Sequence, residues 1–421
     1  MTFARQAGSK LDATAQTPVR NGLARLGGEA PLTLLDAWLG LGLLWLPVGM
    51  LVMPSSISYN PGRLYQSTLA VTLYLPALIV GLRARAAVWR QCWSVPAFRV
   101  FLLLLAWALL SLTWTGAWHP GDEAGRLLSV LFYVLAWQGF AGRAPQRAER
   151  LLAVAALAMA ACALGYGVAF LVQAPGGDGR IAARGVVATA NYAAATMGAA
   201  CVWLCQLPWR AKRWQTVRLV ALTALLFFIV LTQSRGVWLA LALCAVLTPC
   251  WRRADRSAWF IAAAVFAVML VLLCRPLPVL TARGASLRPQ LFAQALELIG
   301  RHPWLGLGQG APFRLEVAGQ SFTHSHNVLT QTAIELGLPG LVLLAALWLR
   351  VAWSGWRHRD EPLGRVVLGA WVYASVALQF DMPQLLTSPR PGWLLVWLPF
   401  GLALGLAARE PQDDSRTLLR P

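Results

Sequence analysis

Long apolar stretches alternate with short polar links along most of the chain. A transmembrane helix needs roughly 20 mostly apolar residues to cross a hydrocarbon core about 30 Å thick. The pattern therefore predicts an all-α fold, a polytopic membrane bundle of about twelve transmembrane helices, with ten to twelve as the safer range. The predicted spans are 33–54, 65–82, 99–115, 125–142, 151–173, 187–208, 217–233, 236–251, 258–275, 329–350, 366–382 and 392–408.

The composition agrees with a membrane protein and argues against several other classes. Hydrophobic residues make up 58% of the chain and charged residues 13%, whereas a soluble domain carries roughly 25% charged residues. The chain contains no Walker motif, no Asp-x-Asp pair and no helical His-Glu-x-x-His. Nothing in the sequence therefore indicates ATP hydrolysis, metal-bound nucleotide sugars or zinc proteolysis.

The net charge of +19 comes from arginines and lysines spread over the short links, a distribution that fits the positive-inside rule better than nucleic-acid binding. Placing the N-terminus in the cytoplasm puts 25 of the 36 Lys and Arg residues on the cytoplasmic side. The N-terminal 30 residues contain no apolar stretch followed by a small-residue cleavage site, so no cleaved signal peptide is expected. The predicted organisation is a cytoplasmic tail at 1–32, nine helices at 33–275, a periplasmic loop at 276–328, three helices at 329–408 and a cytoplasmic tail at 409–421.

The link at 276–328 differs from the others because it is about 50 residues long and only moderately apolar. Long loops are often functional, so we expect the active site here. Apolar residues recur at three- and four-residue spacing from Gln290 to Gly300, just after Pro289, which predicts a short amphipathic helix. Arg288 then lies at the positive end of that helix, where amide hydrogens and a guanidinium favour an anion. The next run, 302–310, predicts a turn.

The strongest local pattern is Thr323-His324-Ser325-His326-Asn327, followed by Glu335-Leu336-Gly337-Leu338-Pro339-Gly340 in the next apolar stretch. This pattern resembles the O-antigen ligase and polymerase superfamily, and most of all its ligases. The ligase signature is a His followed by Asn, Ser or Gln, nine free positions, Gly, two free positions, then Gly, Thr or Val. His326, Asn327, Gly337 and Gly340 match that spacing without a gap.

The likeness extends to other parts of the chain. The link 232–236 is similar to the family's Ser-Arg-Gly step between two helices, and Arg288 with the turn 303–306 is similar to its long loop. The stretch 184–191 is a weaker similarity. The predicted site consists of catalytic His326, Arg288 and Arg235, and of substrate-binding Arg184, Asn191, His324, Asn327 and Trp304.

The resemblance implies an activity. A glycan would pass from undecaprenyl pyrophosphate to a hydroxyl acceptor on the periplasmic face of the bacterial inner membrane, without a metal or another cofactor. For the ligases, the resemblance implies that this acceptor is the lipid A core of lipopolysaccharide.

The arginines suit such a reaction. Breaking a sugar–pyrophosphate bond leaves negative charge on the diphosphate, and preorganised positive groups can stabilise that charge without a metal. Arg235 lies in a short link between two apolar stretches, near the interface where the phosphates of a lipid lie. Its alternative role is to cap a helix hairpin or to meet headgroups, and the alternative for Arg288 is an ordinary exposed loop charge.

The histidines provide candidate bases. An acceptor hydroxyl loses its proton as it attacks, and a neutral imidazole is a suitable general base. We predict His326 for this role, although it could instead only hydrogen-bond a helix start, and the family motif alone distinguishes it from His324. A metal held by both and by His302 is a further alternative. Of the carboxylates, Asp381 shows no recognisable pairing, and Glu335 is expected to make a buried hydrogen bond.

Other functions remain open at this point. Within the superfamily, the polymerase that joins O-antigen repeats and the oligosaccharyltransferase that glycosylates protein Ser or Thr are alternatives. A secondary transporter is an alternative of another class, but it predicts ionisable groups near the bilayer midplane and related halves. The chain instead concentrates its ionisable groups at the predicted outer surface and shows no internal repeat.

Overall fold

The structure is a computed structural model that describes residues 33–54, 62–84, 86–173, 179–274, 286–381 and 384–409. All described helices and strands belong to one compact unit, Leu34–Pro421. The predicted tail at 1–32 lies outside the described residues, as does the tail at 409–421 apart from Arg409. Of the predicted loop at 276–328, the structure describes residues from 286 onward.

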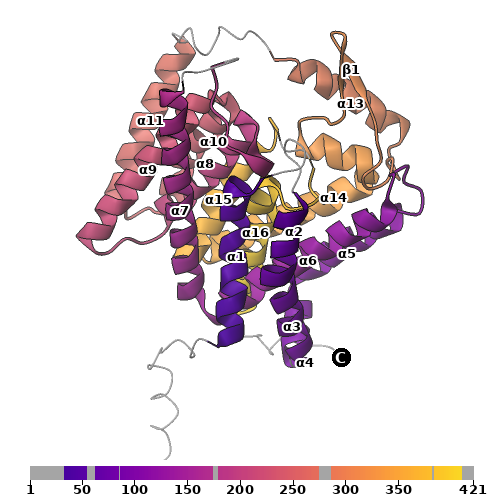
Figure 1. The fold of residues 1–421 in the computed structure, drawn as a ribbon, viewed down its shortest axis with the longest axis horizontal. Helices are drawn as coiled ribbons and strands as arrows, with labels where there is room; N and C mark the ends of the chain where they lie inside the picture. The colour runs from indigo at the N-terminus through magenta and orange to yellow at the C-terminus, as the bar shows by residue number, and fades with distance from the viewer. Residues whose placement is uncertain are drawn as a thin grey trace, which may run out of the picture. The chain divides into compact units, whose positions relative to one another are not determined.

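The described chain is mainly helical (Figure 1). Its helices are α1 (Leu34–Val52), α2 (Arg63–Leu69), the π-helical turn η1 (Ala70–Tyr74), α3 (Leu75–Arg83), α4 (Ala86–Ser94), α5 (Pro96–Ser111), α6 (Pro120–Arg143), α7 (Pro145–Val172), the 3-10 turn η2 (Gly185–Val187), α8 (Ala190–Gln206), α9 (Lys212–Thr232), α10 (Arg235–Leu247), the 3-10 turn η3 (Thr248–Cys250), α11 (Arg256–Cys274), α13 (Arg288–Arg301), α14 (Val328–Arg357), α15 (Pro362–Ala377), the π-helical turn η4 (Trp393–Trp397) and α16 (Leu398–Ala407).

Every predicted apolar stretch coincides with a helix or with a continuous run of helical turns, such as α2, η1 and α3 for 65–82. Six described helical runs are long and apolar enough to cross a membrane: Leu34–Val52, Arg63–Arg83, Pro120–Arg143, Pro145–Val172, Lys212–Thr232 and Val328–Arg357. These runs confirm the helical membrane-protein class. The remaining described apolar helices are shorter, so the count of twelve spans stays a prediction.

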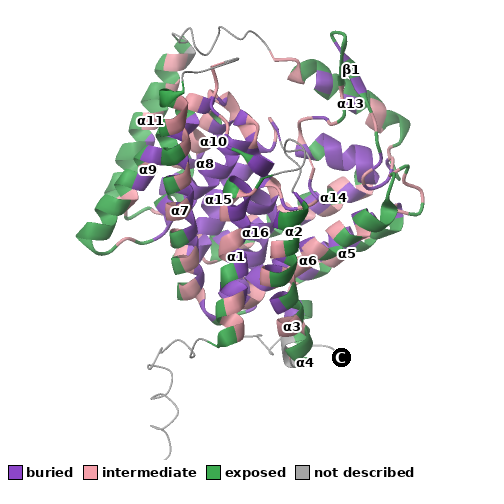
Figure 2. Cartoon of the chain, in the orientation of Figure 1, coloured by how far each residue is buried: buried purple, intermediate pink, exposed green. Residues whose placement is uncertain are grey.

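The helices differ in how much of their surface is buried. Helices α8, α15 and α16 are buried along most of their length, whereas α9 and α11 expose many apolar side chains (Figure 2). Phe260 and Val220 on these two outer helices are 76% and 62% exposed. In a membrane protein, an apolar exposed face is the face that contacts lipid.

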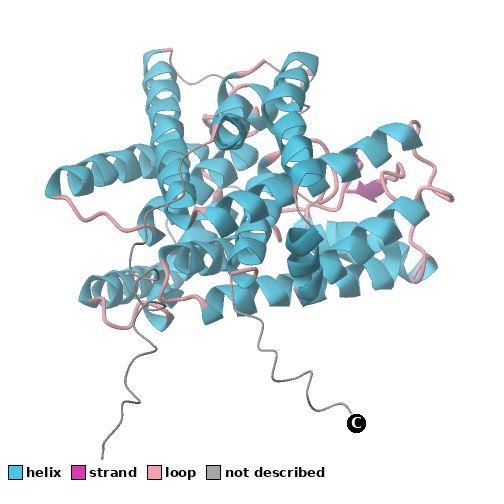
Figure 3. Cartoon of the chain, turned by 90° about the horizontal axis from the view of Figure 1, so that it is seen from below, coloured by secondary structure: helices cyan, strands magenta, loops and turns pink. Residues whose placement is uncertain are grey.

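The segment before α14 forms a small folded unit of its own. Helix α13 confirms the amphipathic helix predicted after Pro289, and its Leu291 and Ala295 pack against Leu315 and Val317. These last two residues belong to β1 (Leu315–Val317), which pairs antiparallel with β2 (Gln320–Phe322). The hairpin is the β structure of the described residues, and the all-α prediction missed it (Figure 3). Its two three-residue strands are too short to produce a clear alternation in the sequence.

A break in α14 explains why the glycine motif and the predicted turn occur together. Gly337 has φ 66° and ψ −173°, and a Cβ there would lie 2.2 Å from the Trp304 carbonyl oxygen. The break leaves helical carbonyls without their usual partners. The turn at 302–310 and α5 supply donors, since Leu307 N bonds Ile334 O, Gly308 N bonds Glu335 O and Trp107 Nε1 bonds Leu336 O, each at 2.8 Å. The start of α14 is thereby fixed to the turn.

Candidate functional site

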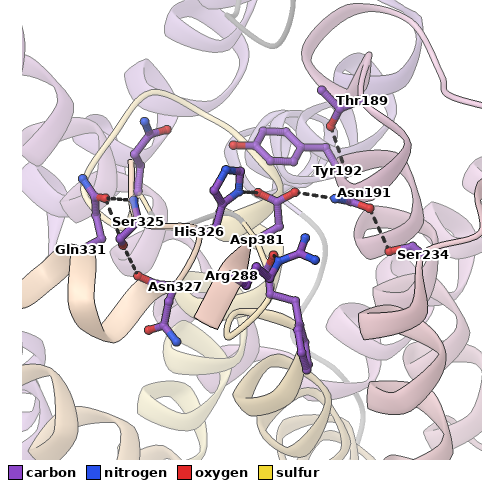
Figure 4. A network of polar contacts seen from close by, with 12 residues as sticks. Thr189, Asn191, Tyr192, Ser234, Arg288, Ser325, His326, Asn327, Gln331 and Asp381 are labelled. Carbon is purple, nitrogen blue, oxygen red and sulfur yellow. Dashed lines mark hydrogen bonds and ion pairs between the residues drawn. The ribbon is translucent and has the colours of Figure 1, made fainter. Parts of the chain in front are cut away.

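Five segments that are distant in sequence meet at one cluster of polar side chains (Figure 4). They are the start of α8, the link between α9 and α10, the start of α13, the turn before α14 and the residues just after α15. The contributing side chains are Asn191, Ser234, Arg288, His326 and Asp381. Every one of these segments lies at a helix end, as expected of a site assembled at one surface of a bundle.

His326 and Asp381 form the centre of this cluster. His326 Nδ1 lies 3.3 Å from Asp381 Oδ1, and Asp381 is only 8% exposed. A carboxylate accepts a hydrogen bond, so it favours the tautomer that carries the proton on Nδ1 and leaves Nε2 able to take another. His326 has φ 55°, a left-handed conformation that costs a non-glycine residue roughly 1–2 kcal/mol. Surrounding contacts evidently hold this histidine in place.

Asn191 orients Asp381 from the other side. Its Nδ2 donates to Asp381 Oδ2 at 2.8 Å, while its Oδ1 accepts from Arg180 Nη2 at 2.9 Å and from Ser234 Oγ at 3.2 Å. Both carboxylate oxygens of Asp381 are therefore engaged, one by the histidine and one by the amide. This arrangement resists rotation of the carboxylate and fixes the imidazole ring.

Three arginines line a cavity of about 250 Å³ beside this pair. Arg288, the first residue of α13, donates from Nε to the Phe380 carbonyl oxygen at 2.7 Å. Burial lowers the pKa of Arg288, as does neighbouring Arg235, whereas Asp381 opposes the shift. Arg180 donates from Nε to the Thr232 carbonyl oxygen at 2.7 Å. Guanidinium groups converging on one cavity are suited to binding a multiply charged anion such as a diphosphate.

His324 lies against His326, with ring centroids 4.1 Å apart. Burial lowers the pKa of His324 to about 4, neighbouring His326 and Arg390 lower it further, and Asp381 opposes them. His324 is therefore uncharged near neutral pH. It therefore adds no positive charge beside His326.

Not every predicted site residue joins the cluster. Of the predicted residues, the structure brings together Arg235, Arg288, His324, His326 and Asn191, while their roles stay predictions. Asn327 caps α14, since its Oδ1 accepts from Leu329 N at 2.9 Å and Thr330 N at 3.2 Å, while its Nδ2 donates to Gln379 Oε1 at 2.8 Å. Arg184 is exposed and does not line the arginine cavity. Trp304 is 69% exposed and also lies outside it. Substrate contacts by these three residues stay predictions.

The sequence indicated no partner for Asp381, and the predicted site did not include Arg180. Asp381 is 55 positions from His326 and 190 from Asn191, and no local spacing signals such pairs. The available signal for Asp381 was a carboxylate at the end of the predicted span 366–382, on the predicted outer side. The expected buried hydrogen bond of Glu335 is confirmed, since its Oε1 accepts from Gln331 Nε2 at 2.7 Å.

One group of potential metal ligands lies in this cluster. The ligand atoms of His324, His326 and Asp381 all lie within 4.8 Å of one another, whereas His302 is not among them. Three such ligands are the minimum for a catalytic zinc site. Nearby arginines disfavour a bound cation, because the positive charges of Arg288 and Arg390 interact electrostatically with Asp381 and His324, respectively.

The fold and this cluster define a class: a multi-pass helical membrane protein with a cationic cavity beside a His–Asp pair. The family model described as O-Antigen ligase matches residues 219–345, a range that contains Arg235, Arg288, His324 and His326. An O-antigen ligase of Pseudomonas aeruginosa is 28% identical over 333 residues, which cover 76% of this chain and 80% of that protein. The resemblance to the O-antigen ligase and polymerase superfamily, and above all to its ligases, is confirmed by these two matches.

Proposed function

We propose that the protein is a ligase-type glycosyltransferase of the bacterial inner membrane. It moves a glycan from undecaprenyl pyrophosphate to a hydroxyl group of the lipid A core, with its active site on the periplasmic face. The single observation that carries this proposal is the His326–Asp381 pair at 3.3 Å beside a cavity lined by three arginines. The similarity to a protein named O-antigen ligase supports the ligase over the polymerase and the protein-directed transferase.

In the proposed reaction, the acceptor oxygen attacks the anomeric carbon of the donor sugar. Nε2 of His326 takes the proton of the acceptor hydroxyl, and Asp381 stabilises the resulting imidazolium. The bond between the anomeric carbon and the pyrophosphate oxygen breaks, and its electron pair leaves with the pyrophosphate. Because this is a single displacement, the configuration at the anomeric carbon inverts.

The arginines act on the leaving group. Negative charge grows on the diphosphate as the bond breaks, so groups already aimed at that position stabilise the transition state more than the bound donor. Arg288 and Arg180 are held by backbone carbonyls at 2.7 Å, so their positions are set before the donor binds. Arg235 adds a third positive charge to the same cavity.

We expect this transfer to proceed without a metal ion. Excess EDTA, or a stronger zinc chelator, leaves the transfer rate of the purified protein unchanged within twofold, because the arginines supply the charge that a metal would supply. The measurement is the initial rate before and after chelation. A large loss of activity that added Zn²⁺ restores would instead assign His324, His326 and Asp381 to a metal site.

The glycan profile of a strain that lacks the gene tests the proposal in cells. The ligase predicts that every O-antigen band disappears from the lipid A core while lipid-linked polymer accumulates. A core that carries one repeat unit would indicate the polymerase instead. Intact lipopolysaccharide together with unglycosylated proteins would indicate the protein-directed enzyme, and unchanged glycans of both kinds would favour a transporter.

A further inference from the structure

A second polar cavity, also about 250 Å³ in volume, lies near His326 and has no role in the reaction described above. We call it the amide–carboxylate cavity. Its lining draws on the start of α6, the turn at 302–310, the first turns of α14 and the segment before η4. Its polar lining includes Glu123, Arg126, Gln309, Gln331, Glu335, Gln384 and Arg390.

This cavity is connected to the catalytic turn. Thr323, which precedes His324, belongs to its lining, and Ser325 N donates to Gln331 Oε1 at 3.1 Å. Figure 4 shows Gln331 and Ser325 on one side of His326, and Asn191 and Ser234 on the opposite side. Asp381 lines the arginine cavity, whereas the turn that carries His326 contacts the amide–carboxylate cavity through Thr323 and Gln331.

The lining groups are buried and fixed. Glu123 is 7% exposed and is ion-paired with Arg126. Its carboxylate packs on Gly310, where a Cβ would lie 2.6 Å from Glu123 Cδ and where φ is 71°. The run of glycines at 306, 308 and 310 thus includes a position at which only glycine leaves room for this carboxylate.

Gln309 supplies an independent indication of a ligand. It is 4% exposed, and its Nε2 donates to the Leu386 carbonyl oxygen at 2.9 Å. Among the residues that the structure describes, none donates a hydrogen bond to its Oε1. A buried amide oxygen without a donor is costly, and a bound hydroxyl group would remove that cost.

The chemistry of the lining favours a sugar over an ion. Carboxylates disfavour a phosphate, and Arg126 and Arg390 disfavour a metal cation. Planar amide, carboxylate and guanidinium groups together offer both donors and acceptors, which a polyhydroxylated ring can match. The volume is smaller than the roughly 300–1,000 Å³ of pockets for drug-sized ligands, which fits a single sugar ring.

We propose that the amide–carboxylate cavity binds the acceptor sugar whose hydroxyl group attacks the donor. This inference rests on the proposed function. In a single displacement, the attacking oxygen and the leaving diphosphate lie on opposite sides of the anomeric carbon. The diphosphate belongs to the arginine cavity, so the acceptor approaches from the other side of the His–Asp pair, within reach of the base that takes its proton.

The test uses the purified full-length protein and a lipid-free core oligosaccharide released from lipopolysaccharide by mild acid. Saturation-transfer NMR measures its Kd, and kinetic assays measure KM for the lipid-linked acceptor and for the donor separately. Glu123→Gln is expected to raise the Kd and the acceptor KM about tenfold or more, because hydrogen bonds to a charged group are weakened, and to leave the donor KM unchanged. Gln384→Ala keeps both carboxylates and is expected to raise the same two constants several-fold.

Glu297→Gln is the matched control. Glu297 is also ion-paired with an arginine on its own helix, but its side chain is 58% exposed and lies outside both cavities. If the Kd and the acceptor KM are unchanged in both cavity variants, or if only the donor KM rises, the acceptor assignment is overturned. The proposed function is unaffected by that result as long as the wild-type enzyme transfers glycan. If the wild-type protein binds the oligosaccharide but transfers no glycan, and the Glu123→Gln variant does not bind it, the result supports the cavity as a sugar site and contradicts the proposed function.

Discussion

Replacing His326 with alanine is expected to lower the rate of glycan transfer by about 10²–10⁴-fold, the range that a positioned general base contributes. Without its imidazole, no group at this position takes the proton of the acceptor hydroxyl. The measurement is the initial rate of transfer by the purified variant, with its melting temperature compared with that of the wild type. His326→Asn is the better-matched variant, because asparagine tolerates the left-handed conformation that His326 adopts at φ 55°.

Two comparisons make this result specific. His302→Ala removes an exposed histidine from the same segment and should keep wild-type activity. Asp381→Asn keeps the shape of the side chain but no longer stabilises the imidazolium, so its loss should be smaller than that of His326→Ala. Full activity of folded His326→Ala would remove His326 as the base and leave His324 as the nearest alternative.

Replacing Arg288 with alanine is expected to lower the rate of transfer by about 10²–10³-fold. This is the usual cost of removing one preorganised group that stabilises a developing negative charge. The guanidinium lies in the arginine cavity and is held by the Phe380 carbonyl oxygen. Arg288→Lys keeps the charge but loses the planar fork, so it should recover only part of the activity. The measurement is the single-turnover rate at saturating acceptor and donor.

Arg301→Ala is the control for this experiment. Arg301 ends the helix that Arg288 begins, and its side chain is 67% exposed and paired with Glu297. A surface ion pair of this kind contributes roughly 0–1 kcal/mol, so the variant should remain folded and active. Equal losses in Arg288→Ala and Arg301→Ala would attribute the effect to α13 as a whole and not to the diphosphate.

The sequence predicted those parts of the molecule that depend on local patterns. Apolar stretches near the length of a membrane span coincide with helices because each helix forms its hydrogen bonds within its own segment. The start of α13 was predictable from Pro289 and the apolar spacing that follows it. The motif around His326 located the turn that joins the polar cluster, and residues as far apart as Arg235 and Arg288 line the same cavity.

The contacts that the sequence did not predict join distant segments. The partners of Asp381 come from α8 and from the turn before α14, and neither periodicity nor spacing relates these positions. Arg180 and Arg184 are four residues apart, yet only Arg180 faces the cavity, because that choice depends on how the link before α8 packs. Asn327 adjoins His326 in sequence, but its side chain caps the start of α14.

In the proposed reaction, the His–Asp pair and the arginine cavity together transfer a glycan from a lipid diphosphate to a hydroxyl group. The direct test combines the purified protein, an undecaprenyl-pyrophosphate-linked glycan and lipopolysaccharide that lacks O-antigen, without nucleotide or added metal. We predict a lipopolysaccharide product whose new glycosidic bond has the opposite anomeric configuration to the donor, together with release of undecaprenyl pyrophosphate. No product from well-folded protein, or a product that retains the donor configuration through a covalent glycosyl-enzyme, would contradict the account.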